Sequence, residues 1–310
     1  MLSVREDQRL RLSARRPPPS PDSFERAILG ALVYADLFDY PLTLEEVHRY
    51  LIAWPASLAE VSERITQSPW LRARITCHDG MWTLRGREDL VRLRQRRTAI
   101  AARLWPDALR YGRILATLPY TRMVAVTGAL AMDNVEEEDD IDYLIVTTPG
   151  RLWLCRAMAI GVVRWAARRG RTLCPNYFLS ERALVLEDRN LFTAHELAQM
   201  IPIAGLAVYQ RMRALNPWTA RFLPNAWGPP WSVEVAPAIR RELTACLEAL
   251  GHMPPGDWLE AWERQRKIRK FSARPAEEVR FDADHCQGHF DGHGRRTLTA
   301  FAERFRRWLD

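Results

Sequence analysis

Two aspartates separated by one residue, Asp140 and Asp142, are the side chains of this sequence best suited to chemistry. They stand at the start of an apolar, β-branched run that predicts a buried strand, and alternate side chains of a strand point to the same face. Two carboxylates about 6–7 Å apart on one face repel each other unless a cation lies between them. Hard oxygen ligands of this kind suit Mg²⁺ or Mn²⁺, and Mg²⁺ usually binds one or two carboxylates together with substrate phosphates.

Gly128, twelve residues before Asp140, supplies the second part of the pattern. It follows another short apolar run at residues 123–126, which also predicts a buried strand. A glycine at that point lets backbone N–H groups approach an anion closely, and a helix beginning there would add its positive end. A phosphate-binding turn followed by paired carboxylates is the layout that metal-assisted nucleotidyl transfer requires. The simpler alternative is that residues 136–142 form a solvated acidic turn before an ordinary strand.

Gly128-Ala129, followed by Asp140-Ile141-Asp142 and an apolar strand, resembles the signature of the polymerase β-like nucleotidyltransferase superfamily. That signature consists of Gly-Ser, a short spacer and Asp-x-Asp. The resemblance implies that Asp140 and Asp142 are catalytic ligands of Mg²⁺ or Mn²⁺. It also implies that Gly128 and Ala129 hold the phosphates of a nucleoside triphosphate such as ATP.

Two positions depart from the signature. The serine of the superfamily is Ala129 here, so its hydroxyl contact to phosphate is lost and only backbone donors remain. The superfamily usually has a third carboxylate on a later strand, and the strand expected at residues 174–179 offers Asn176 instead. Arg151 and Arg156, in the first turns of a predicted helix, could contact phosphate or could equally be surface arginines.

Three functions remain open on these residues. The first is a Mg²⁺-dependent nucleotidyltransferase that moves a nucleoside monophosphate from a nucleoside triphosphate to a protein, nucleic acid, sugar or small molecule. The second is a non-catalytic nucleotide-binding or regulatory module with a degenerate fold, which Ala129 and Asn176 favour. The third is a DNA-binding regulator that acts through the N-terminal part of the chain.

Residues 22–86 resemble a winged-helix domain, with three short helices followed by a hairpin. Thr43 and Glu46 form a capping box that predicts the start of the second helix, and Asp79-Gly80 predicts the hairpin turn. DNA recognition needs cationic contacts to phosphate, but the helix expected at residues 57–67 carries a single base, Arg64. A packing module is therefore favoured over a DNA-binding module.

The rest of the chain divides at its helix and turn signals. Residues 87–118 predict connecting helices interrupted at Pro106, and residues 119–216 a nucleotidyltransferase-like domain with strands near 174–179 and 183–186. Within that domain Thr193 and Glu196 predict a capping box, and His195 between them a structural histidine. The segments predicted outside these parts are a disordered arm at 1–21, a proline-rich linker at 217–236 and a helical C-terminal region at 237–310. The expected fold class is α+β, with a small mixed sheet flanked by helices.

Composition sets wider limits. The 310 residues carry a net charge of +7, which permits an anionic partner, including DNA, without identifying one. Five scattered cysteines without a Cys-x-x-Cys pair favour free thiols. Neither a signal peptide nor an apolar run of membrane-spanning length is expected, so we predict a cytoplasmic protein without membrane insertion. His285, His289 and His293 recur every four residues, but the glycines beside them favour a polar loop over a metal-binding helix.

Overall fold

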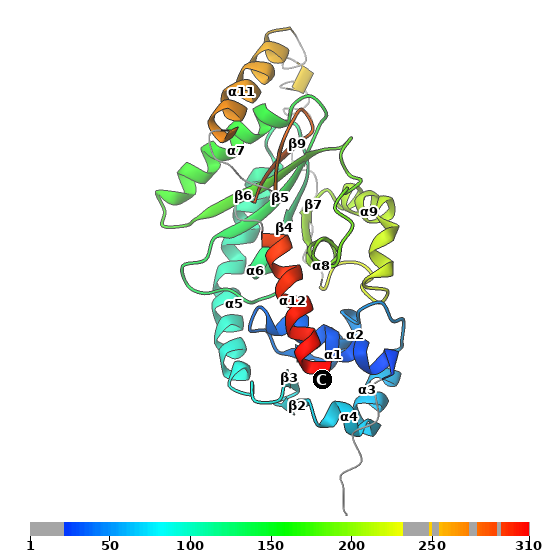
Figure 1. Ribbon diagram of the computed structural model, residues 1–310. Helices are drawn as coiled ribbons and strands as arrows, with labels where there is room; N and C mark the ends of the chain where they lie inside the picture. The colour runs from blue at the N-terminus through cyan, green and yellow to red at the C-terminus, as the bar shows by residue number, and fades with distance from the viewer. Residues whose placement is uncertain (1–21, 232–247, 250–253, 273–277, 290–292, 310) are drawn as a thin grey trace, which may run out of the picture.

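The computed structural model describes residues 22–231, 248–249, 254–272, 278–289 and 293–309 (Figure 1). The arm predicted at residues 1–21 lies outside the described residues. The end of the predicted linker and the start of the predicted C-terminal region also lie outside them, because only residues 248 and 249 are described between residues 232 and 253.

The N-terminal part contains four helices and a small three-stranded sheet in the order β1-β3-β2. Asp22, Thr43 and Ser57 each accept a hydrogen bond from a backbone N–H of the helix they begin, and the Thr43 capping box is as predicted. The hairpin is also confirmed, because Asp79 and Gly80 both adopt positive φ between β2 and β3. The elements are α1 (Ser23–Asp36), β1 (Leu42–Thr43), α2 (Leu44–Arg49), α3 (Leu58–Gln67), α4 (Pro69–Arg72), β2 (Ile75–His78) and β3 (Met81–Leu84).

A single 27-residue helix, α5 (Leu90–Ala116), replaces the interrupted helices predicted for this segment. Pro106 lies inside it, so the prediction that Pro106 ends a helix is wrong. Proline removes one backbone donor from the helix. Burial on both sides of it outweighs that cost: Ala101 and Leu104 before the proline, and Ala108 and Tyr111 after it, pack into one apolar core.

The central sheet has six strands in the order β7-β4-β5-β6-β9-β8. Its neighbouring strands are antiparallel except for β5 and β6, which are parallel, so the sheet is mixed and the α+β class is confirmed. Its strands are β4 (Thr121–Val126), β5 (Ile141–Thr147), β6 (Leu173–Ser180), β7 (Ile201–Ala204), β8 (Glu278–Phe281) and β9 (His285–His289).

Three predictions for the second half of the chain differ from the structure. Residues 183–186 form no strand, and the edge of the sheet is β7 instead, where Pro202 is tolerated because one side of an edge strand is unpaired. The C-terminal region is not only helical, because β8 and β9 pair with each other and β9 pairs with β6. The predicted linker at residues 217–236 begins with a short 3₁₀ helix, η1 (Pro217–Arg221). Trp218 and Leu223 of this segment are buried in the core.

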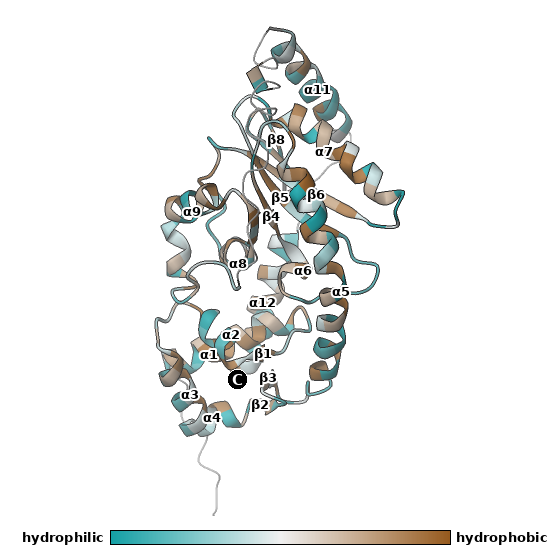
Figure 2. Cartoon of the chain, turned by 180° about the vertical axis from the view of Figure 1, so that it is seen from behind, coloured by the Kyte–Doolittle hydropathy of each residue, from teal (hydrophilic) through white to brown (hydrophobic). Residues whose placement is uncertain are grey.

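Helices cover both faces of the sheet (Figure 1). Val124, Tyr143 and Ile145 pack toward α5 and α7, while Ala125 and Leu144 pack toward α8 and the N-terminal part. The alternation along β4 and β5 therefore separates two apolar cores, and apolar residues run along both strands in Figure 2. The remaining helices are α6 (Gly128–Ala131), α7 (Leu152–Ala167), α8 (Leu191–Gln199), α9 (Leu206–Leu215), α11 (Pro254–Ser272) and α12 (His293–Leu309). In the described part of the chain, none of the helices has the length and apolar character needed to cross a bilayer.

Candidate functional site

Gly128 and Asp142 lie against each other where β4 ends and β5 begins. The antiparallel pairing of Val126 with Tyr143 brings these two ends of the strands together. Gly128 has a φ of +66°, and a Cβ atom at this position would lie 2.5 Å from Oδ2 of Asp142. Glycine is therefore required both by the left-handed backbone and by the carboxylate beside it. This contact forms what we call the Gly128–Asp142 corner.

The carboxylate of Asp142 is half-buried and only partly compensated. Asn176 on β6 donates a hydrogen bond from Nδ2 to its Oδ1 over 2.9 Å. Burial raises the pKa of Asp142 to about 7, and the charge of Asp140 adds to the rise, while a hydrogen bond with the Cys174 thiol opposes it. A carboxylate in this state would be stabilised by a cation.

Asp140 differs from Asp142 in its surroundings. It precedes the first residue of β5, is exposed to solvent, and does not line the cavity described below. Its charge nevertheless contributes to the raised pKa of Asp142. The structure thus places the two predicted ligands in electrostatic contact, with Asp142 inside and Asp140 at the surface.

The oxygen donors at this corner fit Mg²⁺ or Mn²⁺ in kind. Within the described residues, no group of three or more His, Cys, Asp or Glu side chains is arranged to hold a metal ion. The protein ligands would accordingly be the carboxylates of Asp142 and Asp140, with Asn176, which donates its amide N–H to Asp142, in the position predicted for a third carboxylate. Phosphate and water would complete the coordination, as is usual for Mg²⁺.

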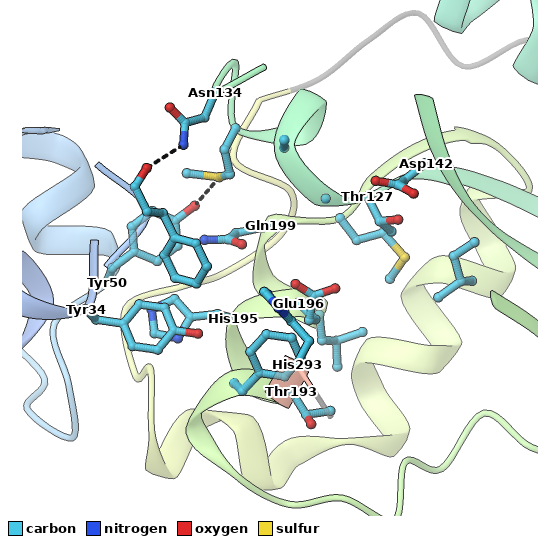
Figure 3. A pocket seen from close by; sticks show the side chains of 18 of the residues that line it. Tyr34, Tyr50, Thr127, Asn134, Asp142, Thr193, His195, Glu196, Gln199 and His293 are labelled. Carbon is cyan, nitrogen blue, oxygen red and sulfur yellow. Dashed lines mark hydrogen bonds between the residues drawn. The ribbon is translucent and has the colours of Figure 1, made fainter. Parts of the chain in front are cut away.

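A cavity of about 630 Å³ opens beside the Gly128–Asp142 corner. It lies between α1, α8, the first turn of α12 and the central sheet (Figure 3). Gly128, Ala129, Asp142 and Asn176 line one end of it. A volume of this size suits a small-molecule ligand or nucleotide.

Glu196 also lines the cavity, although the sequence pattern gave it another role. Asn190 caps α8 by accepting a hydrogen bond from Thr193 N–H over 2.9 Å, so the helix begins before the predicted Thr193–Glu196 capping box. Glu196 is thereby left free to point toward the cavity (Figure 3). Burial raises its pKa to about 7, and the charge of Asp142 contributes further. The signal that could have identified Glu196 is Asn190, an equally good N-cap residue.

His195 is structural, as predicted. Its Nδ1 lies 3.0 Å from the carbonyl oxygen of Leu191, and its ring stacks on Tyr34 with a centroid separation of 3.8 Å. Burial lowers the pKa of His195 to about 4, so the ring is neutral near pH 7.

The structure does not bring Arg151 and Arg156 to the cavity. Arg151 follows the far end of β5 from Asp142 and pairs with Asp257 on α11 over 2.6 Å. Arg156 on α7 hydrogen-bonds the Cys286 thiol of β9. Both arginines join elements on the α7 side of the sheet, and neither lines the cavity.

The other two candidate sites are the three histidines at 285, 289 and 293 and the predicted DNA-binding helix at residues 57–67. The histidines are separated, and the arginine of that helix is already paired. His285 and His289 belong to β9 whereas His293 begins α12, so the three histidines do not share a helix. In the N-terminal part, Arg64 on α3 pairs with Asp22 over 2.7 Å, which reduces its availability to a phosphate backbone.

Comparisons with known proteins give no family for this chain: no family model matches it, and no curated protein or solved structure is significantly similar.

Proposed function

We propose that the chain is a nucleotidyltransferase that binds a nucleoside triphosphate and Mg²⁺ (or Mn²⁺) at the Gly128–Asp142 corner. One observation carries the proposal: a glycine turn whose geometry excludes any side chain lies directly against a half-buried carboxylate. Gly128 brings backbone without a side chain to the wall of the cavity, where the phosphates would lie, and the carboxylate provides a ligand for the cation that must accompany them.

Each residue of the corner has a separate role in the proposal. Asp142 and Asp140 bind the divalent cation, which would neutralise charge on the phosphates. Asn176 orients the Asp142 carboxylate through its hydrogen bond. The turn at Gly128 and Ala129, which lines the cavity, presents its backbone to the phosphates. In the transfer, an acceptor oxygen bonds to the α-phosphorus, pyrophosphate leaves with the electrons of the broken P–O bond, and the acceptor proton passes to solvent.

A second candidate, a nucleotide-binding module without catalysis, is favoured by Asn176. A neutral amide occupies the position where the superfamily signature leads us to expect a third carboxylate. In addition, Ala129 offers no hydroxyl to a phosphate. Both candidates require binding of the nucleotide and metal at the same corner, and they differ only in turnover.

The test is pyrophosphate release from each of the common nucleoside triphosphates with Mg²⁺, with protein hydrolysate, RNA, sugars and amino alcohols supplied as acceptors. We expect activity in the wild type and a loss of about 100-fold or more in Asp142→Asn, since metal ligands contribute several kcal/mol. The matched control is Glu137→Gln, an exposed acid on the same loop that pairs with the exposed Arg103.

The outcomes separate the candidates. Metal-dependent nucleotide binding that Asp142→Asn abolishes, without turnover on any acceptor, would support the non-catalytic module. Equal nucleotide binding by wild type and Asp142→Asn would contradict both.

A further inference from the structure

The carboxylate of Glu196 is an uncompensated charge inside the cavity. It makes no hydrogen bond or ion pair with any residue that the structure describes, and its closest electrostatic relationship is with Asp142, another anion. A half-buried charge without a partner is unfavourable, and proteins usually pair such groups or neutralise them. Neither the metal nor the phosphates of the proposed function account for Glu196, which projects from α8 rather than from the Gly128–Asp142 corner.

The wall beside Glu196 is aromatic and neutral. Tyr34 from α1 stacks on His195, and Tyr50 lies on the same histidine at a centroid separation of 5.6 Å. The Tyr34 side chain is almost fully buried, and its hydroxyl has no hydrogen-bond partner among the described residues. Figure 3 shows this hydroxyl directed into the cavity. Aromatic faces attract cations, and an unpaired phenol can accept a hydrogen bond from one.

The charges that line the cavity leave its interior negative. Asp142 and Glu196 are its acids, and Arg296 is the one arginine or lysine among its described lining residues. Arg296 lies in the first turn of α12 and is exposed to solvent. Apolar side chains fill much of the remaining wall, including Leu186, Leu197, Met200 and Met212.

We propose that the cavity binds a small molecule with a protonated amine on an apolar body, with the amine placed between Glu196 and the hydroxyl of Tyr34. The role of this molecule as acceptor, through a hydroxyl group that it would carry apart from the amine, rests on the proposed function, whereas its binding does not. A carboxylate and aromatic rings favour an organic cation over a neutral or anionic molecule of the same shape. The volume of about 630 Å³ excludes a folded macromolecule from the interior.

The test uses three probes of one shape, namely phenylbutylamine, phenylbutanol and phenylbutyrate, which are cationic, neutral and anionic. Binding to the full chain is measured by calorimetry at pH 8, without nucleotide or metal. We expect the wild type to bind the amine about tenfold or more tightly than the alcohol, and the acid least. This comparison needs no variant, so it stands even if a substitution disturbs folding.

Glu196→Gln, a substitution of similar volume, should remove the preference for the amine over the alcohol. Glu45→Gln, on the exposed first turn of α2, should leave the preference unchanged. The proposal is overturned if the wild type does not bind the amine, if alcohol and amine bind equally, or if Glu196→Gln keeps the preference. It is also overturned if adenosine or guanosine displaces the amine and binds more tightly, since the cavity would then be a nucleobase site.

The two proposals fail separately. Amine binding without nucleotidyl transfer to any acceptor would support the amine-binding site and contradict the enzymatic function. Transfer from a nucleoside triphosphate without any preference for the amine probe would do the reverse.

Discussion

Asn176 donates a hydrogen bond from Nδ2 to Oδ1 of Asp142 over 2.9 Å, joining two neighbouring parallel strands at the Gly128–Asp142 corner. The amide stabilises the carboxylate without adding negative charge. An aspartate in the same place would supply a charged oxygen to a cation but would repel Asp142 when no cation is bound. Asparagine at position 176 therefore favours the metal-free protein, whereas aspartate would favour the metal-bound protein.

The first prediction concerns Asn176→Asp. The added carboxylate should raise Mg²⁺ affinity by about tenfold and lower the free energy of unfolding of the metal-free protein by about 1–3 kcal/mol at pH 8. Calorimetric titration with MgCl₂ and urea unfolding measure the two effects. The exchange variant Asp142→Asn/Asn176→Asp has the wild-type number of carboxylates and is the control. Unchanged Mg²⁺ affinity in Asn176→Asp would show that residue 176 does not face the cation.

A second prediction compares Gly128→Ala with Gly150→Ala. Both glycines have left-handed backbones, with φ values of +66° and +72°, but a Cβ at Gly150 would meet no atom within 4 Å. Gly150→Ala should therefore cost about 1–2 kcal/mol of backbone strain alone. Gly128→Ala should cost at least about 1 kcal/mol more, because the Asp142 carboxylate must move.

Nucleotide binding should also differ between Gly128→Ala and Gly150→Ala. Titration with a nucleoside triphosphate and Mg²⁺ should show binding lost in Gly128→Ala and retained in Gly150→Ala. Equal stability and equal binding in the two variants would contradict the close contact at the corner.

The sequence predicts a contact of this site better when the two residues are close to each other along the chain. Gly128 follows the end of one strand and Asp142 begins the next, antiparallel strand, so local strand patterns suffice to bring them together. Asn176 was also predicted to lie beside them, because β6 follows β5 through one helix, which is the usual connection of parallel strands.

The remaining features lacked a local signal. The role of Glu196 depended on a choice between two N-cap residues, Asn190 and Thr193, that sequence alone does not decide. β8 alternates polar and apolar residues over only four positions, and β9 is mostly polar and contains a glycine, so the local strand signal of this hairpin is weak. They form because β6 offers an unpaired edge more than 100 residues earlier, as the Phe178–Cys286 pairing shows.

The third prediction concerns stability between pH 5 and 7, where Asp142 loses its proton in the folded protein. The pKa of Asp142 is raised to about 7 in the folded protein from its ordinary value of 3.8, so the folded state binds a proton that the unfolded state releases. Stability from this group is present below about pH 4 and is lost as pH rises through 7. The unfolding free energy of the metal-free wild type should thus fall by up to about 1.4 kcal/mol per pH unit between pH 5 and 7.

Asp142→Asn should reduce this fall, and Glu137→Gln should not. Saturating Mg²⁺ should also flatten the wild-type profile, because a bound cation replaces the proton. Urea unfolding at a series of pH values measures each profile. A profile with the same slope in wild type and Asp142→Asn would contradict a half-buried, only partly compensated carboxylate at this position.

The last prediction concerns the acid side and His195. Its pKa is lowered to about 4 by burial, from an ordinary value of 6.5, so the unfolded state binds a proton that the folded state excludes. Stability should therefore be lost as pH falls from 6.5 toward 4, by about 3 kcal/mol in total. His195→Phe keeps an aromatic ring against Tyr34 and removes the titrating group, so its stability should fall by about 2–3 kcal/mol less than that of the wild type over this interval. His78→Asn, at an exposed position at the end of β2, is the control and should retain the wild-type acid profile. If His195→Phe and wild type lose stability in parallel on acidification, His195 is not held neutral in the stack, and the aromatic wall of the cavity is cationic rather than neutral near pH 6.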